Sequence, residues 1–143
     1  VFYIGGTKIG ALCGEAVVFT HNNAHRHFFS IQKQHGAVIA KGRLIGVQFE
    51  ALFTDNLYFE ISKHAIDMAM KVRDLFRSRG YRFYLDSPSN QQFVVMTKEQ
   101  ADALSKNIQF TYFGQTDNGD VIARFVTSWS TTEEELAELA KYI

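Results

Sequence analysis

The sequence of 143 residues contains a single cysteine and a single proline. One cysteine cannot form a disulfide within the chain, which favours a reducing compartment such as the cytoplasm. Because Cys13 lies among apolar neighbours, we expect a buried packing thiol there and no nucleophile. The scarcity of proline and a hydrophobic content of 46% exclude a disordered chain and predict one compact unit or a few tightly joined pieces.

Charge of one sign is also missing, because fifteen basic side chains offset fifteen acidic ones. No basic stripe with interleaved aromatic residues occurs, so we expect neither a nucleic acid nor an anionic membrane as a partner. No apolar run is long enough to span a bilayer, and the start lacks a positively charged leader with a cleavage motif. These absences favour a soluble protein whose ligand is a small molecule.

What is present is a lysine in an unusual setting. An apolar run at residues 1–4 ends in Gly5, Gly6, Thr7 and Lys8. A lysine on a short glycine-rich loop after a buried strand is partly desolvated, and desolvation favours the neutral amine that attacks an aldehyde. Glycine N–H groups and a threonine hydroxyl can hold a phosphate beside it. The loop thus suits a phosphorylated aldehyde such as pyridoxal phosphate, although a tight hairpin ending in a solvated lysine is the alternative.

Elements can be predicted along the first half of the chain. Residues 1–4 and 15–20 predict two strands, and their continuous apolar runs are typical of a sheet buried on both faces. Residues 37–53 predict a helix. From residue 57 to residue 79, apolar positions recur every three or four residues, which predicts a long amphipathic helix that ends at Gly80.

After Gly80 the pattern changes to short strands separated by turns. Thr97 is suited to cap one helix, and the sequence from Ser130 to Glu135 is suited to open another. The dipeptide Asn118-Gly119 favours a tight hairpin between the last two strands. The second half is therefore predicted to be a β-β-α-β-β-α unit with a small antiparallel sheet, whose strands fall at 81–85, 92–96, 108–114 and 121–127.

Two sets of polar residues require a separate account. Arg124 stands in an otherwise apolar strand, where its guanidinium must reach the sheet edge or meet an anion, because an unpaired buried charge is unfavourable. Its planar fork fits a carboxylate; a rim arginine paired with a neighbouring glutamate is the alternative. His25, His27 and His35 lack the spacing of a metal site and have no cysteine or carboxylate beside them, so we expect no metal.

These motifs together resemble the threonine aldolase and β-eliminating lyase family of fold-type I pyridoxal-phosphate enzymes. The chain departs from many members at Cys13, at Lys33 and at Ser128-Trp129, and the last two departures bear on substrate preference. The matching segments are VFYIGGTKIGALCGEAVVF at residues 1–19, Lys33-Gln34-His35-Gly36, Leu52-Phe53-Thr54-Asp55-Asn56-Leu57-Tyr58, Ser89-Asn90-Gln91 and Arg124-Phe125-Val126-Thr127.

The resemblance implies an α/β fold with three parts. Residues 1–56 would form the end of the large-domain sheet with the cofactor lysine loop, residues 57–80 a long linking helix, and residues 81–143 a small C-terminal α+β domain with an antiparallel sheet. Family members are more than twice as long, and Val1 already lies in a predicted strand. We therefore expect the chain to be the C-terminal part of a larger enzyme.

The resemblance also implies a pyridoxal-phosphate-dependent lyase that cleaves threonine or allo-threonine to glycine and acetaldehyde, as a cytoplasmic homodimer or homotetramer. Lys8 would form the Schiff base, with Gly6, Thr7 and Lys33 near the cofactor. The α-carboxylate of the substrate would bind Arg124. Asn90 of the Ser89-Asn90-Gln91 segment would help to line the same site, and an asparagine that only forms a turn is the alternative for this residue. A lyase that eliminates a β-substituent from another amino acid, and a catalytically silent fragment or interaction module, are the alternatives.

Overall fold

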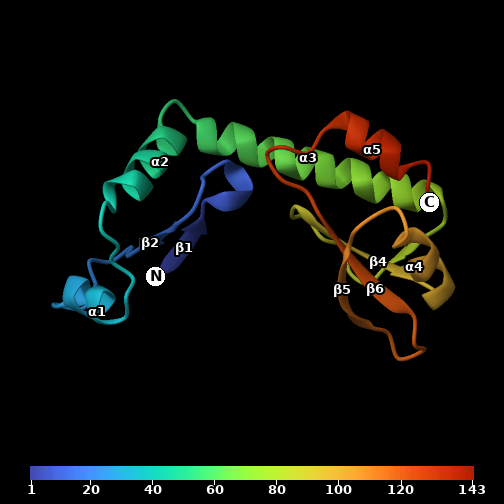
Figure 1. Ribbon diagram of the computed structural model, residues 1–143, viewed down its shortest axis with the longest axis horizontal. Coiled ribbons are helices and arrows are strands. Elements are labelled where there is room, and N and C mark those ends of the chain that lie inside the picture. The colour runs from blue at the N-terminus through green and yellow to red at the C-terminus, as the bar shows by residue number, and fades with distance from the viewer. The chain divides into compact units, whose positions relative to one another are not determined.

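A computed structural model describes residues 1–143, and the chain divides into two compact units, Val1–Ile61 and Ser62–Ile143 (Figure 1). The first unit holds β1 (Phe2–Gly5), the 3₁₀ helix η1 (Thr7–Ile9), β2 (Glu15–Val18), α1 (Phe28–Gln34) and α2 (Arg43–Phe53). The long helix α3 (Leu57–Ser78) begins in the first unit and lies mostly in the second. The second unit continues with β3 (Arg82–Phe83), β4 (Gln91–Met96), α4 (Lys98–Leu104), β5 (Thr111–Gln115), β6 (Val121–Val126) and α5 (Glu133–Leu139).

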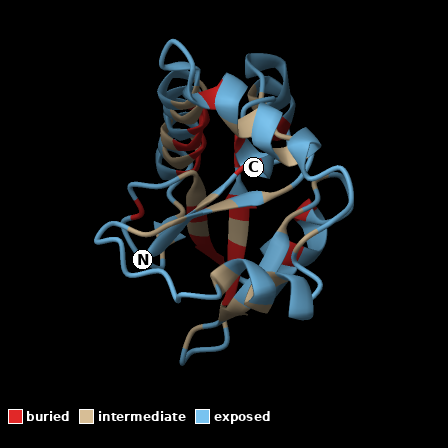
Figure 2. Cartoon of the chain, turned by 90° about the vertical axis from the view of Figure 1, so that its left-hand side faces the viewer, coloured by how far each residue is buried: buried red, intermediate tan, exposed pale blue.

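The second unit is a four-stranded antiparallel sheet with helices packed on one face. The strand order is β3-β4-β6-β5, so β6 lies inside the sheet and β5 at its edge. Alternate residues of β4 and β6 face the helices and form the core with side chains from α3, α4 and α5. Figure 2 draws buried residues in red. The buried residues of this core are Val72, Phe76, Val94, Met96, Ala101, Leu104, Val121, Ala123, Phe125 and Leu139.

Local sequence explains where the helices and turns of this unit begin and end. The side chains of Thr97 and Thr132 cap α4 and α5 in complete capping boxes, and a backbone hydrogen bond lowers the pKa of Glu134 at the start of α5. Gly80 ends the segment after α3 with a φ of 79°, and Gly119 turns the β5–β6 hairpin with a φ of 84°. Both angles lie in the left-handed region that glycine adopts without strain.

The predicted β-β-α-β-β-α order and the long helix are therefore confirmed. The first strand of the unit is shorter than expected, since β3 covers only Arg82–Phe83, and β5 begins at Thr111 instead of residue 108. The assignment of residues 57–80 as a link between a large and a small domain stays a prediction.

Several expectations for the first unit are wrong. The two strands predicted at residues 1–4 and 15–20 are present as β1 and β2, which pair in antiparallel register. Their expected burial on both faces is not found, since Tyr3 and Val17 are 72% and 49% exposed and no layer of this unit covers the two-stranded sheet. The helix predicted over 37–53 begins only at Arg43, since Lys41 adopts a left-handed φ of 66° that a helix cannot include. Helix α1 was not expected, and the thiol of Cys13 is exposed instead of buried.

No helix of the structure combines the length and the apolar character needed to cross a bilayer.

The aromatic centre of the second unit gives a test of its core. Phe76 of α3 is fully buried, and its ring lies 4.8 Å from that of Phe125 and 5.2 Å from that of Tyr81. We expect Phe76→Ala to lower the free energy of unfolding of the second unit by about 3–5 kcal/mol, because it leaves a cavity. Ile66→Ala on the same helix, at a residue that is 39% exposed, is the control and should change it by less than about 1 kcal/mol. Urea unfolding followed by the fluorescence of the single tryptophan measures both; equal losses would contradict this account of the core.

Candidate functional site

The lysine loop is a compact turn built around the backbone of Gly6. The Gly6 carbonyl accepts hydrogen bonds from the N–H groups of Ile9 at 3.2 Å and Ala11 at 3.0 Å, and the Gly6 N–H donates to the Gly14 carbonyl at 3.3 Å. Gln48 of α2 completes the loop, because its side-chain oxygen accepts the N–H of Leu12 at 2.6 Å. The turn that carries the lysine is thus hydrogen-bonded to the residue before β2 and to a side chain of α2.

Close packing explains why glycine occupies two positions of this loop. A Cβ at Gly6 would lie 2.8 Å from the Ala11 side chain and 3.2 Å from the ring of Phe49. A Cβ at Gly14 would lie 2.6 Å from Ile45 of α2, and its backbone has a φ of 100°. Neither position has room for a side chain, whereas a Cβ at Gly5 would meet no atom within 4 Å.

The loop exposes the candidate cofactor residues unequally. Lys8 and Thr7 lie on η1 and are exposed, and Lys8 forms no ion pair with an acidic side chain. The expected partial burial of Lys8 is therefore not found in this unit. Gly6 is buried and its N–H is already bonded to Gly14, so its backbone serves the fold of the loop and is not free for a phosphate.

Lys33 lies in the last turn of α1 and is exposed. The segment Lys33-Gln34-His35-Gly36 thus begins inside this helix, and at the start of the helix the ring of Phe28 packs against that of Phe19 at 4.9 Å. No acidic side chain pairs with Lys33. A role for this ammonium group in holding a phosphate stays a prediction.

Arg124 occupies the face of the second unit's sheet that is opposite the helical core. It lies on β6, directly across from Phe93 of β4 and Thr111 of β5. The residue is half-buried, its Nε atom is buried without a hydrogen-bond partner, and Nη1 lies 3.5 Å from the side-chain oxygen of Gln91. No carboxylate pairs with Arg124, so the alternative of a rim arginine paired with a glutamate is not what the structure shows.

Asn90 joins the start of β4 to the end of β6. Its side-chain N–H₂ donates to the Thr127 carbonyl at 2.7 Å, and its own carbonyl accepts the Thr127 N–H at 3.0 Å. The Thr127 hydroxyl in turn donates to the Ala65 carbonyl of α3 at 2.6 Å. Asn90 therefore has a structural role close to Arg124, and its contact with a substrate stays a prediction.

The sheet face that carries Arg124 also carries an aromatic cluster. The rings of Phe93 and Phe113 lie 4.8 Å apart, and Tyr84 lies 6.4 Å from Phe113. Tyr84 and Phe113 are each about half exposed. Phe113 reaches this cluster because the register of β5 shifts between Tyr112 and Gly114, which is typical of a β-bulge.

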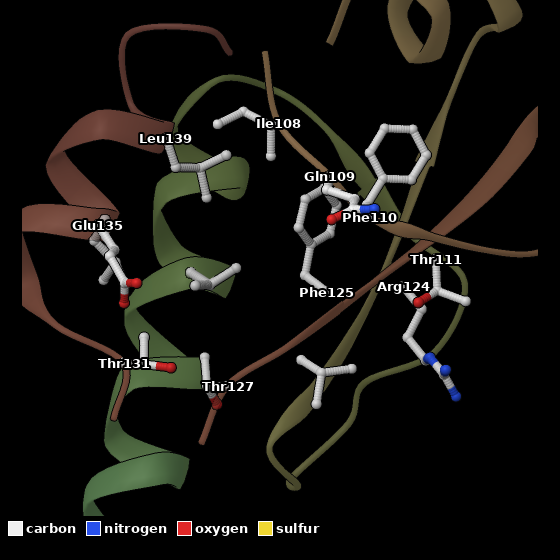
Figure 3. A pocket seen from close by; sticks show the side chains of 13 residues that line it. Ile108, Gln109, Phe110, Thr111, Arg124, Phe125, Thr127, Thr131, Glu135 and Leu139 are labelled. Carbon is white, nitrogen blue, oxygen red and sulfur yellow. The ribbon is translucent and has the colours of Figure 1, made fainter. Parts of the chain in front are cut away.

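A cavity of about 560 Å³ lies beside β6, and Arg124 is among the residues that line it. Its walls come from α5, from the segment before β5 and from the end of β6, including Glu135, Leu139, Phe110 and Thr127. In Figure 3 the guanidinium of Arg124 points away from Leu139 and Glu135. Arg124 thus belongs to the wall of the cavity, and its guanidinium is directed away from α5.

The structure groups the candidate residues into two sets. Lys8, Thr7 and Gly6 share one loop of the first unit, and Arg124 and Asn90 lie at the β4–β6 end of the second. Lys33 lies apart from both sets, on α1. No group of three or more histidine, cysteine, aspartate or glutamate side chains is arranged to hold a metal ion.

Known proteins resemble this chain in sequence and in structure. No protein-family model matches the chain. A low specificity L-threonine aldolase of a Pseudomonas species is 28% identical over 141 residues, which cover 98% of this chain and 40% of that protein. The enzyme of the same description from Pseudomonas aeruginosa is 27% identical over 146 residues, covering 100% of this chain and 41% of that protein. A solved structure of Leishmania major threonine aldolase matches with a TM-score of 0.90 and 34% identity over 98% of this chain and 41% of that one.

The chain resembles threonine aldolases along its whole length. The resemblance expected from the motifs is therefore confirmed, and so is the α/β fold of fold-type I enzymes with helices and antiparallel sheets. The chain spans about 40% of the length of the threonine aldolases that it matches.

One residue of interest was not singled out from the sequence. Gln91 belongs to the matched Ser89-Asn90-Gln91 segment, but its contact with Arg124 depends on the pairing of β4 with β6. Period-two alternation places Gln91 and Phe93 on one face of β4, and a correct register would have put that face beside Arg124.

The glycine packing of the threonine aldolase-like loop gives a second test. We expect Gly6→Ala to destabilise the loop by about 1–3 kcal/mol, because the new methyl group overlaps Ala11 and Phe49. Hydrogen exchange of the Ile9 and Ala11 N–H groups, which bond to the Gly6 carbonyl, should then lose about tenfold or more of its protection.

Gly5→Ala is the matched control, because a Cβ there meets open space. It should leave the exchange of these N–H groups within about twofold of the unchanged chain. Equal loss of protection in both variants would show that the packing of Gly6 does not determine the loop.

Proposed function

We propose that the protein that carries this chain is a pyridoxal-phosphate-dependent lyase that cleaves β-hydroxy-α-amino acids, threonine and allo-threonine among them, to glycine and an aldehyde. The observation that carries the proposal is the match to a threonine aldolase structure over 98% of the chain at 34% identity. The half-buried guanidinium of Arg124, which has no carboxylate partner, supports the carboxylate-bearing ligand that this proposal requires.

The residues of the lysine loop suit the cofactor in part. Lys8 presents an exposed side chain without an ionic partner, so its amine, once deprotonated, would be accessible to the aldehyde carbon of pyridoxal phosphate. The exposed hydroxyl of Thr7 and the ammonium group of Lys33 are available to hold the phosphate. Gly6 acts through the loop fold and not through its N–H. When bound, the cofactor stabilises the negative charge that develops at the substrate Cα.

Arg124 has the chemistry of a carboxylate site. Its guanidinium is planar and presents parallel N–H donors that match the two oxygens of a carboxylate. Holding the α-carboxylate at one place fixes the orientation of the bonds at Cα, and orientation decides which of these bonds breaks. Asn90 lies at the end of the same strand pair and is proposed to line the substrate position.

By the same reasoning we propose a cytoplasmic homodimer or homotetramer with a small amino acid as its ligand. A single cysteine in the chain accords with a reducing compartment, and the exposed apolar side chains of the first unit, such as Tyr3 and Leu44, accord with a protein surface that is covered in a larger assembly.

A covalent label tests the role of Lys8. Incubation of the protein with pyridoxal phosphate, reduction with borohydride and peptide mass analysis should place the pyridoxyl group on Lys8. Lys8→Ala should abolish the label at this peptide, whereas Lys41→Ala removes another lysine of the same unit and should leave the label unchanged. A label on other lysines only, or none, would remove the cofactor assignment.

Kinetics test the role of Arg124. Arg124→Ala should raise the KM for threonine by about 10–100-fold, since a charge-assisted hydrogen bond contributes roughly 1.5–3 kcal/mol, and should leave the affinity for pyridoxal phosphate unchanged. Arg82→Ala is the control, because Arg82 pairs with Asp120 on the surface. Equal losses of substrate and cofactor affinity in Arg124→Ala would instead indicate a structural arginine.

A further inference from the structure

The immediate surroundings of Arg124 contain one polar side chain that touches the guanidinium. Gln91 of β4 lies opposite Val126 and thus one diagonal step from Arg124 on the same sheet face. Its side-chain oxygen accepts a long hydrogen bond from Nη1 at 3.5 Å. The direct cross-strand neighbours of Arg124, Phe93 and Thr111, bring no charge to it.

The partner of Arg124 is therefore a neutral amide, in contrast to those of three other arginines in the unit, whereas Arg79 donates to the Ala140 carbonyl. Arg73, Arg77 and Arg82 each pair with an aspartate. A carboxylate beside Arg124 would compensate its charge and compete with any anion that binds there, whereas an amide oxygen restrains one N–H group and leaves the charge intact.

The backbone of Gln91 is held firmly enough for such a restraint. Its N–H donates to the Ser89 hydroxyl at 3.2 Å, and the next residue, Gln92, is 1% exposed and donates to the carbonyls of Ser87 and Ser89, each at 3.2 Å. On the other side, Asn90 is bonded to Thr127. The start of β4 is thus fixed to a turn and to the end of β6, which flanks Arg124.

We infer that Gln91 is a positioning residue for Arg124: it orients the guanidinium through a neutral hydrogen bond so that the full positive charge is presented to the carboxylate of the ligand. This inference rests on the proposed carboxylate-binding role of Arg124. It predicts that the charge of the residue at position 91 determines carboxylate affinity more strongly than the loss of the hydrogen bond itself.

Two substitutions of similar size separate these contributions. Gln91→Glu keeps the shape and adds a carboxylate, so we expect the KM for threonine to rise by about tenfold or more, as Arg124 becomes neutralised. Gln91→Met removes the acceptor without adding charge and should raise KM by only about 2–5-fold. The affinity for pyridoxal phosphate should stay unchanged in both variants. Gln115→Glu, on the edge strand β5 and paired with Val121, adds the same charge to the sheet and should leave KM unchanged.

A second measurement does not depend on catalysis. Phenylglyoxal reacts with free guanidinium groups, and peptide mass analysis gives its rate of reaction at Arg124. Gln91→Glu should slow this reaction at least about threefold relative to Gln91→Met, because an ion pair shields the guanidinium. Equal rates, or a KM for Gln91→Glu no higher than for Gln91→Met, would overturn the inference.

The two proposals fail in different ways. If Arg124→Ala leaves the KM for threonine unchanged, the carboxylate role of Arg124 is wrong, and the role inferred for Gln91 falls with it. If Arg124→Ala raises KM as expected and the two substitutions of Gln91 do not differ in KM or in phenylglyoxal reactivity, only the inference about Gln91 is overturned.

Discussion

The second unit must hold one positive charge, that of Arg124, on an interior strand where no acidic side chain compensates it. Removing a guanidinium from water without a counter-charge is unfavourable, so such a charge persists only where the surrounding structure holds it. Arg124 lies on β6, which pairs with β4 on one side and β5 on the other. Behind it, Phe125 packs against Phe76 in the core. The burial of that core offsets the unfavourable position of the charge and leaves its exposed side available to an anion.

The lysine loop follows a different principle. Few side chains of the first unit are buried, Ile9 and Leu52 among them, and the loop is shaped by the absence of side chains at Gly6 and Gly14. Such a loop can hold Lys8 in one place but does not surround it with apolar atoms. In the proposed enzyme, the dry environment that favours a neutral amine must therefore be supplied by residues outside this unit.

Short-range patterns predicted the parts of the fold whose causes are local. The period of α3, the capping Thr97, the opening of α5 within residues 130–135 and the Asn118-Gly119 turn each depend on a few neighbouring residues, so the sequence alone identified them. Which residue of 130–135 caps α5, namely Thr132, came from the structure. The exposure of β1 and β2 depends on what covers them, and a continuous apolar run carries no such information. Lys8 and Arg124 differ from their immediate neighbours in the sequence and could therefore be recognised as unusual. The contact of Gln91 with Arg124 could not, because it depends on the register of two strands.

The neutrality of the Arg124 partner limits what the sheet face can recognise. A site that pairs its arginine with an aspartate, as Arg77 pairs with Asp86, gains little from a second anion because the charge is already compensated. An arginine restrained by an amide keeps its attraction for a carboxylate and loses part of its rotational freedom before the ligand arrives. The aromatic rings of Phe93 and Phe113 lie on the same face and provide an apolar surface beside the charge, although Phe113 is itself about half exposed. In the proposed enzyme, a charge restrained before the ligand arrives and an adjacent apolar surface would together favour ligands that carry a carboxylate next to an apolar or weakly polar group.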